Sequence, residues 1–427
     1  MDKYKKLASN TIIFAIGTFS SKILSFLLMP FVTRMMGTGD YGAADLVQQT
    51  VNVLIPIVTL QVNSAALRFA LDKAVNKADV FKVGVRTTLA GFAVFLLFTY
   101  PLNLLTINDF HLGDYIILIV AFVLVSSFRQ LCQQFVRGCG HVVAIIASDA
   151  CSVIFYFATA KLYRYIGFNK LKDKGIAHQM LKYCVPLIPT VVLWWIINVS
   201  DRYMITYFIS SSANGLYTAA SKIPNFVILF SQIFIDAWQL SAVDEYDQEG
   251  GAQFFTKVFR VYSGGIFAVA SVLILLCQII TKILVADDYY DSWQYVPILI
   301  IATTYSCIVN FLASVYMAKK KSVMSLVTAM SGAVTNFVLN LVFIPRLGAN
   351  GAALATVCAF LVVFVTRGLD TRRYIKIDFK LPILLGETAV LVTQSLLLLK
   401  FKSGVMIYVI EAVLVAAMLL LNLKPIK

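Results

Sequence analysis

Long apolar runs recur along this chain about every 30 to 35 residues, and each is about the 20 residues that a helix needs to cross a bilayer. Because backbone groups inside a bilayer must hydrogen-bond within their own segment, such runs form helices. We therefore predict an all-α polytopic membrane protein. Its thirteen predicted spans lie near residues 10–35, 43–66, 84–105, 115–135, 141–163, 183–208, 214–240, 261–285, 294–317, 323–343, 351–369, 381–399 and 404–422.

The composition supports a membrane location and argues against nucleic acid as a partner. The chain is 59% apolar and 14% charged, with a mean hydropathy of +0.82, whereas soluble domains are roughly 45 to 50% apolar. The net charge of +14 would favour nucleic-acid binding in a soluble protein. Here the basic residues lie in the loops between apolar runs, where they orient the chain in the bilayer.

Basic residues alternate between rich and poor loops. Most of the 36 Lys and Arg residues fall in one set of loops, and such loops stay in the cytoplasm, so we expect both termini to be cytoplasmic. The run 141–163 has basic loops on both sides, and a full crossing there would invert every later loop. We therefore predict that 141–163 makes no simple crossing and that the first half of the chain is one span short.

The central stretch from Val185 to Leu240 carries charges inside its apolar runs. Two runs, separated by the polar gap ISSSAN at 209–214, hold Asp201, Arg202, Lys222 and Asp236. Charges at membrane depth are costly, and they usually face a cavity or a partner charge on a substrate or ion path. This hairpin is therefore the first candidate for a functional site.

A weak internal repeat relates the two halves of the chain. At an offset of 173 residues, TRMMGTGDYGAA from Thr33 aligns with TYFISSSANGLY from Thr206, so that Gly42 lies over Gly215. Each copy ends one apolar run with a glycine-containing turn and begins the next run. Repeats of this kind favour two pseudo-symmetric helical lobes with a binding site between them.

Three stretches resemble one transporter family: KILSFLLMPFVTRMMGTGDYGAADL from Lys22, SDRYMITYFISSSANGLYTAASKIP from Ser200 and VFIPRLGANGAALAT from Val342. They are similar to the polysaccharide transporter (O-antigen flippase, Wzx-like) family of the multidrug/oligosaccharidyl-lipid/polysaccharide (MOP) flippase superfamily. The resemblance implies two six-helix lobes around a central cavity, followed by two extra helices. We accordingly expect an N-terminal lobe at 1–165, shortened at 141–163, a second lobe at 166–371 and two further helices at 372–427.

The resemblance also implies a function. Such a protein flips an undecaprenyl-diphosphate-linked oligosaccharide across the bacterial inner membrane by alternating access, for capsule, exopolysaccharide or O-antigen synthesis. Its expected partners are this lipid-linked substrate, membrane lipids, and the polysaccharide polymerase and export machinery. Two alternatives remain open at this point, a multidrug or metabolite exporter of the same architecture and a membrane scaffold that transports nothing.

Cations inside or beside the spans are the candidate substrate ligands. Arginine can grip a phosphate through two hydrogen bonds and lysine supplies a point charge, so cations facing one cavity suit a diphosphate. Alternatively, these side chains lie at span ends, extend to the membrane surface or pack against other polar groups between helices. The candidates are Lys22, Arg202, Lys222, Arg34 and Arg68.

Acidic residues within the spans are candidates for ion coupling or for structural pairing. A coupled transporter needs a carboxylate whose charge can change as the cavity changes face. The candidates are Asp45, Asp149, Asp201, Asp236, Glu387 and Glu411. The chain has no phosphate-binding loop and no metalloprotease motif, and its His and Cys residues are scattered, so we predict neither an enzyme nor a metal or other cofactor.

Overall fold

The computed structural model describes residues 27–72, 75–139, 175–185, 188–245, 250–319, 322–401 and 404–423. Within these residues helices dominate, and the strands are limited to one short hairpin of β1 (Thr106–Ile107) and β2 (Phe110–His111). Seven described helices are long and apolar enough to cross a membrane, or nine if each of two bent helix pairs counts as one span. The predicted all-α membrane fold is confirmed. The segment 141–163 lies outside the described residues.

The chain forms two compact units, one of residues 44–195 and one of residues 1–43 with 196–427. Two helices, α2 (Thr38–Val58) and α10 (Ile188–Phe208), cross the boundary between the units in sequence. The units are therefore joined within helices rather than through loops. The division at 1–165, 166–371 and 372–427 stays a prediction.

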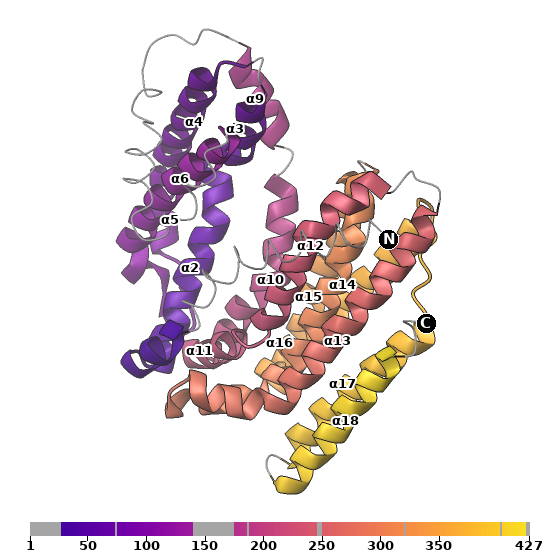
Figure 1. Cartoon of the computed structure of the whole chain (residues 1–427). Helices are drawn as coiled ribbons and strands as arrows, with labels where there is room; N and C mark the ends of the chain where they lie inside the picture. Colours follow the sequence, from indigo (N-terminus) through magenta and orange to yellow (C-terminus); the bar gives the residue numbers. More distant parts are fainter. Residues whose placement is uncertain are drawn as a thin grey trace. The chain divides into compact units, whose positions relative to one another are not determined.

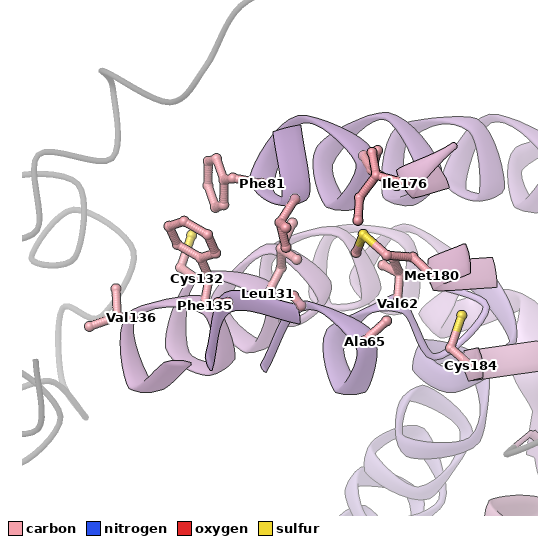
Figure 2. Close-up of a cluster of buried hydrophobic side chains, with 14 residues drawn as sticks. Val62, Ala65, Phe81, Leu131, Cys132, Phe135, Val136, Ile176, Met180 and Cys184 are labelled. Carbon is pink, nitrogen blue, oxygen red and sulfur yellow. The ribbon is translucent and has the colours of Figure 1, made fainter. Parts of the chain in front are cut away.

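The unit of residues 44–195 has a core where four helices meet. Figure 2 shows this cluster, in which the Phe81 and Phe135 rings lie 4.8 Å apart, centroid to centroid. Asn76 caps α4 by accepting a hydrogen bond from the backbone N–H of Ala78, which fixes where that helix begins. The helices of this unit beyond α2 are α3 (Val62–Leu71), α4 (Lys77–Leu97), α5 (Thr99–Asn103), η1 (Leu112–Tyr115), α6 (Ile116–Gly138) and α9 (Ile176–Cys184).

The other unit holds most of the long helices in Figure 1. An aromatic core joins two of them: the indole of Trp238 stacks on Phe311 at 4.9 Å and donates a hydrogen bond to Ser314. Beyond α10, the helices are α11 (Ser211–Ala220), α12 (Asn225–Glu245), α13 (Gly251–Leu284), η4 (Asp287–Gln294), α14 (Val296–Ala318), α15 (Ser322–Leu347), α16 (Ala349–Thr371), α17 (Leu381–Phe401) and α18 (Val405–Leu423).

Two predicted spans are broken rather than continuous. The span predicted at 43–66 bends by 59° between α2 and α3, because Leu60 and Gln61 both have positive φ angles that no α-helix can continue through. The span predicted at 214–240 bends by 48° between α11 and α12. Pro224 lies in that break, where it lacks the N–H that a continuing helix would need.

The polar gap predicted at 209–214 is shorter than expected. Helix α11 already begins at Ser211, because the Ser210 hydroxyl accepts a hydrogen bond from the N–H of Ala213 and caps the helix. The matching turn after Gly37 is equally short, since α2 begins at Thr38. The small polar residues therefore start helices instead of forming loops.

These two helix starts, which the repeat aligns, lie against each other. The hydroxyls of Thr38 and Ser212 are hydrogen-bonded at 2.6 Å, and the Asn214 amide donates to the carbonyl of Gly42 at 3.1 Å. The repeat shows again one turn earlier, where Thr33 and Thr206 each donate to the carbonyl four residues before them. The contact itself is therefore built from the aligned stretches of the two repeats.

Candidate functional site

A polar cavity opens among five helices of the unit that contains residues 196–427. Its open space measures about 580 Å³, and helices α10, α11, α12, α14 and α16 all contribute side chains. The lining residues are Asn198, Asp201, Arg202, Tyr217, Ser221, Pro224, Asn225, Ile228, Leu299, Ala302, Thr303, Ser306, Thr356 and Phe360. Hydroxyls and amides alternate there with apolar groups, which suits a ligand that is polar but largely uncharged over most of its surface.

Asp201 is held at the cavity wall by hydrogen bonds to its carboxylate. The side chain is 4% exposed, and its Oδ2 accepts a hydrogen bond of 2.7 Å from the Tyr217 hydroxyl. The backbone N–H of Arg202 donates to Oδ1 at 2.9 Å. Burial of a carboxylate is tolerated when its oxygens are satisfied in this way, and the tyrosine comes from α11, which turns back beside α10.

The Arg202 guanidinium is oriented by two hydroxyl groups of α11 and the turn that follows it. One terminal nitrogen donates to Thr218 Oγ1 at 2.9 Å, and the other donates to Ser221 Oγ at 3.3 Å. Hydroxyls fix the plane of the guanidinium without removing its charge. A planar, oriented guanidinium at a cavity wall can bind a phosphate oxygen pair in a defined direction.

A buried chain of polar side chains continues from this wall into the unit. Thr356 lines the cavity and accepts a hydrogen bond from the Asn336 amide at 3.2 Å. Asn336 in turn accepts hydrogen bonds from Ser200 at 3.1 Å and from Asn340 at 3.0 Å. Sequence reasoning missed both asparagines, although their spacing of four residues within an apolar run signals a polar stripe on one helix face.

Comparisons with known proteins show which proteins this chain resembles. Residues 7–141 match the family of polysaccharide biosynthesis proteins. Over 64 residues the chain is 30% identical to a protein of the Lsg locus of Haemophilus influenzae, an alignment that spans 15% of this chain and 16% of that relative. The structure of lipid II flippase MurJ in an inward closed conformation matches with a TM-score of 0.62 and 15% identity, covering 97% of this chain and 98% of that one.

Two multidrug transporters share the fold. The MATE multidrug transporter DinF-BH has a TM-score of 0.59 at 16% identity, covering 86% of this chain and 95% of that chain. An outward-facing MATE family transporter of the MOP superfamily has a TM-score of 0.52 at 13% identity, covering 87% and 95%. The chain therefore shares its fold with a lipid II flippase and with MATE transporters, and its N-terminal part resembles polysaccharide biosynthesis proteins. The predicted resemblance is confirmed, and the two-lobed all-α architecture is that of these solved structures.

Among the predicted cations, Arg202 reaches the cavity. Lys222 is half-buried in the turn between α11 and α12, next to the lining residue Ser221, but is not one of the described residues that line the cavity. Arg34 is exposed on the helix of residues 27–35. Arg68 is exposed on α3, where its guanidinium lies over the Tyr183 ring at 5.3 Å. Lys22 lies outside the described residues.

The predicted acids are dispersed through the fold. Asp201 lines the cavity, and Asp45 on α2 accepts a hydrogen bond from Gln49 at 3.2 Å. Glu387 on α17 and Glu411 on α18 are buried. Asp149 and the side chain of Asp236 lie outside the described part of the chain. Among the described residues, no group of three or more His, Cys, Asp and Glu side chains could hold a metal ion.

A polar face on α2 is a second feature that sequence reasoning missed. Gln48 donates to Asn52, and Asn52 donates to Gln49, which places three amides along one side of an otherwise apolar helix. At the repeat offset of 173 residues, Gln48 aligns with Ser221 and Asn52 with Asn225. Both of the aligned residues line the cavity, so each repeat carries polar side chains at equivalent positions.

Arg367 is a charged residue whose burial the sequence did not predict. The sequence places it with the basic loop that follows, yet it belongs to α16 and is fully buried. Its guanidinium donates to the carbonyls of Val309 and Ser325 and to Thr328 Oγ1, at 2.9 to 3.3 Å. The group also lies 5.5 Å from the Tyr316 ring centre. Arg367 therefore ties α14, α15 and α16 together behind the cavity.

Proposed function

We propose that this protein flips an undecaprenyl-diphosphate-linked oligosaccharide repeat unit across the bacterial inner membrane, for the synthesis of a surface polysaccharide. The observation that carries the proposal is Arg202, oriented by Thr218 and Ser221 at the wall of a cavity rich in hydroxyls and amides. The match of residues 7–141 to polysaccharide biosynthesis proteins, and a fold shared with a lipid II flippase, support it.

The two parts of such a cargo have different chemical requirements, and the cavity offers groups for both. A diphosphate needs a cation with directed donors, which the Arg202 guanidinium supplies. Sugar hydroxyls both donate and accept, as do the side chains of Asn198, Asn225 and Ser306. The lipid tail would remain in the bilayer while the head group passes through the cavity.

A flipping assay tests the proposal. The full chain is reconstituted in vesicles with a fluorescent undecaprenyl-diphosphate sugar, and head groups that reach the other leaflet are counted by a membrane-impermeant quencher. Arg202→Ala should reduce the rate at least about tenfold, which corresponds to ~1.4 kcal/mol. Arg202→Lys should recover only part of it, because an ammonium cannot replace the planar fork.

Arg346→Ala is the matched control, since Arg346 is an exposed arginine at the end of α15. It should flip the substrate at the wild-type rate. A wild-type rate for Arg202→Ala, with the protein folded and inserted, would refute the role of Arg202. Absence of any flipping by the wild-type chain would instead refute the substrate class and favour a membrane scaffold.

A multidrug exporter is the second candidate function. The MATE relatives share the fold, and Asp201 gives the cavity an acid that could attract a cationic compound. The same vesicles, loaded with a cationic dye, separate the two functions. Dye export that is lost in Asp201→Asn, together with no flipping of the lipid-linked sugar, would favour the exporter.

We also propose an inner-membrane location with both termini in the cytoplasm, and cooperation with a polysaccharide polymerase and export machinery. The alternation of basic and poor loops supports the orientation. Reporter fusions at Lys427 and within 167–174 should both report cytoplasm. A reporter that is active outside at Lys427 would contradict this orientation.

A further inference from the structure

Helices α13, α17 and α18 pack against one another and bury a row of polar side chains between them (Figure 1). The row runs along α13 from Arg260 to Gln278, eighteen residues or ~27 Å of helix, which is close to the ~30 Å thickness of a hydrocarbon core. We call it the polar seam. Its members are Arg260, Ser263, Ser271 and Gln278 of α13, Glu387 and Gln394 of α17, and Tyr408, Glu411 and Asn422 of α18.

One end of the seam holds a small cavity with both a base and an acid in its wall. Arg260, Ser263, Glu387 and Asn422 line it, together with Lys380 from the basic loop before α17. The Glu387 side chain is 2% exposed, and the Asn422 amide faces it. The cavity volume is about 10 Å³, which is room for about one water molecule beside this carboxyl group.

The middle of the seam holds a second carboxyl group. The Ser271 hydroxyl donates to the Gln394 side-chain oxygen at 2.8 Å, and the Gln394 amide reaches back to the Ser271 carbonyl at 3.4 Å. Glu411 lies beside Gln394 and is fully buried. Within the described residues, neither Glu411 carboxylate oxygen has a hydrogen-bond partner.

The other end of the polar seam consists of two neutral side chains that are hydrogen-bonded to each other. The Tyr408 hydroxyl donates to the Gln278 side-chain oxygen at 2.9 Å, one turn of α18 from Glu411. Tyr290 of the η4 segment faces Tyr408 from outside the three helices. Polar groups therefore occur at both ends and in the middle of the seam.

Helix packing alone does not require acidic residues in the polar seam. Serine, asparagine and glutamine suffice to hold membrane helices together through hydrogen bonds. An ionised carboxylate that is buried without partners costs several kcal/mol, whereas a carboxylic acid there is neutral and can donate a hydrogen bond. Acidic residues at two depths of a membrane protein, joined by polar groups, are the chemistry of a proton relay.

We propose that the polar seam is a proton-binding site, in which Glu387 and Glu411 take up and release protons separately from the substrate cavity. Each step is the reversible association of one carboxylate with one proton to give one carboxylic acid. Glu387 exchanges with water at the basic end and Glu411 holds the deeper proton. The proposal concerns proton binding, and it does not depend on the cargo of the cavity.

The titratable groups that face the two acids are few. Glu387 faces Arg260 of α13, Lys380 of the preceding loop and Tyr305 of α14. Glu411 faces Cys277 of α13 and lies one turn from Tyr408 of its own helix. No cationic side chain among the described residues lies within 4 Å of the Glu411 carboxylate as a salt bridge, so the proton is the charge that can neutralise it.

A hydrogen bond connects the seam to the helix that lines the substrate cavity. Thr388, the residue after Glu387, is bonded to the Tyr305 hydroxyl of α14 at 2.6 Å. The next residue of α14, Ser306, lines the cavity. A change in charge at Glu387 therefore occurs next to Thr388, which contacts a helix that lines the cavity.

Infrared difference spectroscopy of the purified full chain in lipid nanodiscs tests the proposal without any cargo. The protonated carboxyl group has its own C=O stretch, so a pH titration shows each buried carboxylic acid that forms or disappears. The wild-type chain should show such a titrating band. Glu411→Gln and Glu387→Gln should each remove part of it, and the double variant should remove the sum of the two parts, because each carboxyl group binds one proton.

Asp291→Asn is the matched control, because Asp291 is an exposed acid of η4 outside the seam. It should leave the buried band unchanged. If Glu411→Gln fails to fold, Glu411→Asp takes its place and should shift the band rather than remove it. A wild-type spectrum with no titrating buried carboxyl band, or a band that is unchanged in the double glutamine variant, would overturn the proposal.

Discussion

Gly42 and Gly215 contact each other's helix backbone in a reciprocal way. A Cβ atom on Gly42 would collide with the carbonyl oxygen of Ser211, and one on Gly215 would collide with the carbonyl oxygen of Thr38. Each collision partner lies four residues before the opposite glycine, and both pairs obey the repeat offset of 173 residues. At the contact between the starts of α2 and α11, each glycine thus packs against the carbonyl oxygen that lies four residues before the other glycine.

This reciprocity predicts that Gly215→Val strongly destabilises the protein. Backbone atoms cannot move aside as a flexible side chain can, so we expect a loss of about 1 to 3 kcal/mol, as for other overpacked sites. Thermal unfolding in detergent measures it. Gly265→Ala on α13 is the control, because a Cβ there meets nothing within 4 Å, and it should be neutral or slightly stabilising.

Tyr217→Phe should destabilise the cavity wall. The substitution removes the hydroxyl that donates to Asp201 and leaves one oxygen of a buried carboxylate without that bond, which costs about 1 to 3 kcal/mol. Chemical unfolding of the purified protein checks this value. The matched change at the 63% exposed Tyr207 should have little effect, and equal effects of the two substitutions would contradict our account of Asp201.

Arg367→Met should weaken the packing of three helices without touching the cavity. The new side chain fills similar space but leaves the carbonyls of Val309 and Ser325 without the guanidinium donors. Each buried polar group that loses its partner costs about 1 to 3 kcal/mol. A lowered melting temperature for Arg367→Met, with none for the exposed Arg372→Met, is the expected pattern. Equal melting temperatures for the two variants would argue against it.

Asp378 predicts a pH dependence at the basic loop before α17. The backbone N–H of Lys380 donates to its carboxylate at 2.9 Å, and the Lys380 ammonium lies 3.2 Å away, so the pKa of Asp378 falls below its usual value. A lowered folded-state pKa contributes stability above the unfolded pKa of about 3.9. That stability is lost as the pH falls through the folded-state pKa.

Asp378→Asn removes this contribution, so its melting temperature should be slightly below that of the wild type at neutral pH. The difference should shrink as the pH falls below the unfolded-state pKa of about 3.9, because the wild type then progressively loses this contribution. A difference that stays constant over this range would show that the carboxylate charge does not matter. The expected effect is small because Asp378 is exposed.

The sequence was sufficient for the class of the fold and for the ends of several spans. The predicted spans 294–317, 351–369 and 381–399 coincide closely with α14, α16 and α17, because their apolar runs end at polar or basic residues. The break after α2 was not predictable, since Leu60 and Gln61 have positive φ without being glycine. A left-handed pair of this kind depends on tertiary packing and leaves no local signal.

The candidate site was partly visible in the sequence. Arg202 stood out because a charge inside an apolar run needs a reason, and the structure places it at a cavity. Its partners could not be predicted, because Thr218 and Ser221 reach it only after α11 turns back on α10. Arg367 was hidden by its nearness to Arg372 and Arg373, since a basic cluster after a span looks the same whether or not the helix continues through its first member.

The polar seam has a consequence for shortened forms of this protein. A chain that ended before Leu381 would lose α17 and α18, and the face of α13 that carries Ser271 and Gln278 would then meet acyl chains, which offer no hydrogen bonds. The last two helices therefore cannot be trimmed as an appendage. Any natural or engineered variant without them would have to replace those polar side chains of α13 with apolar ones.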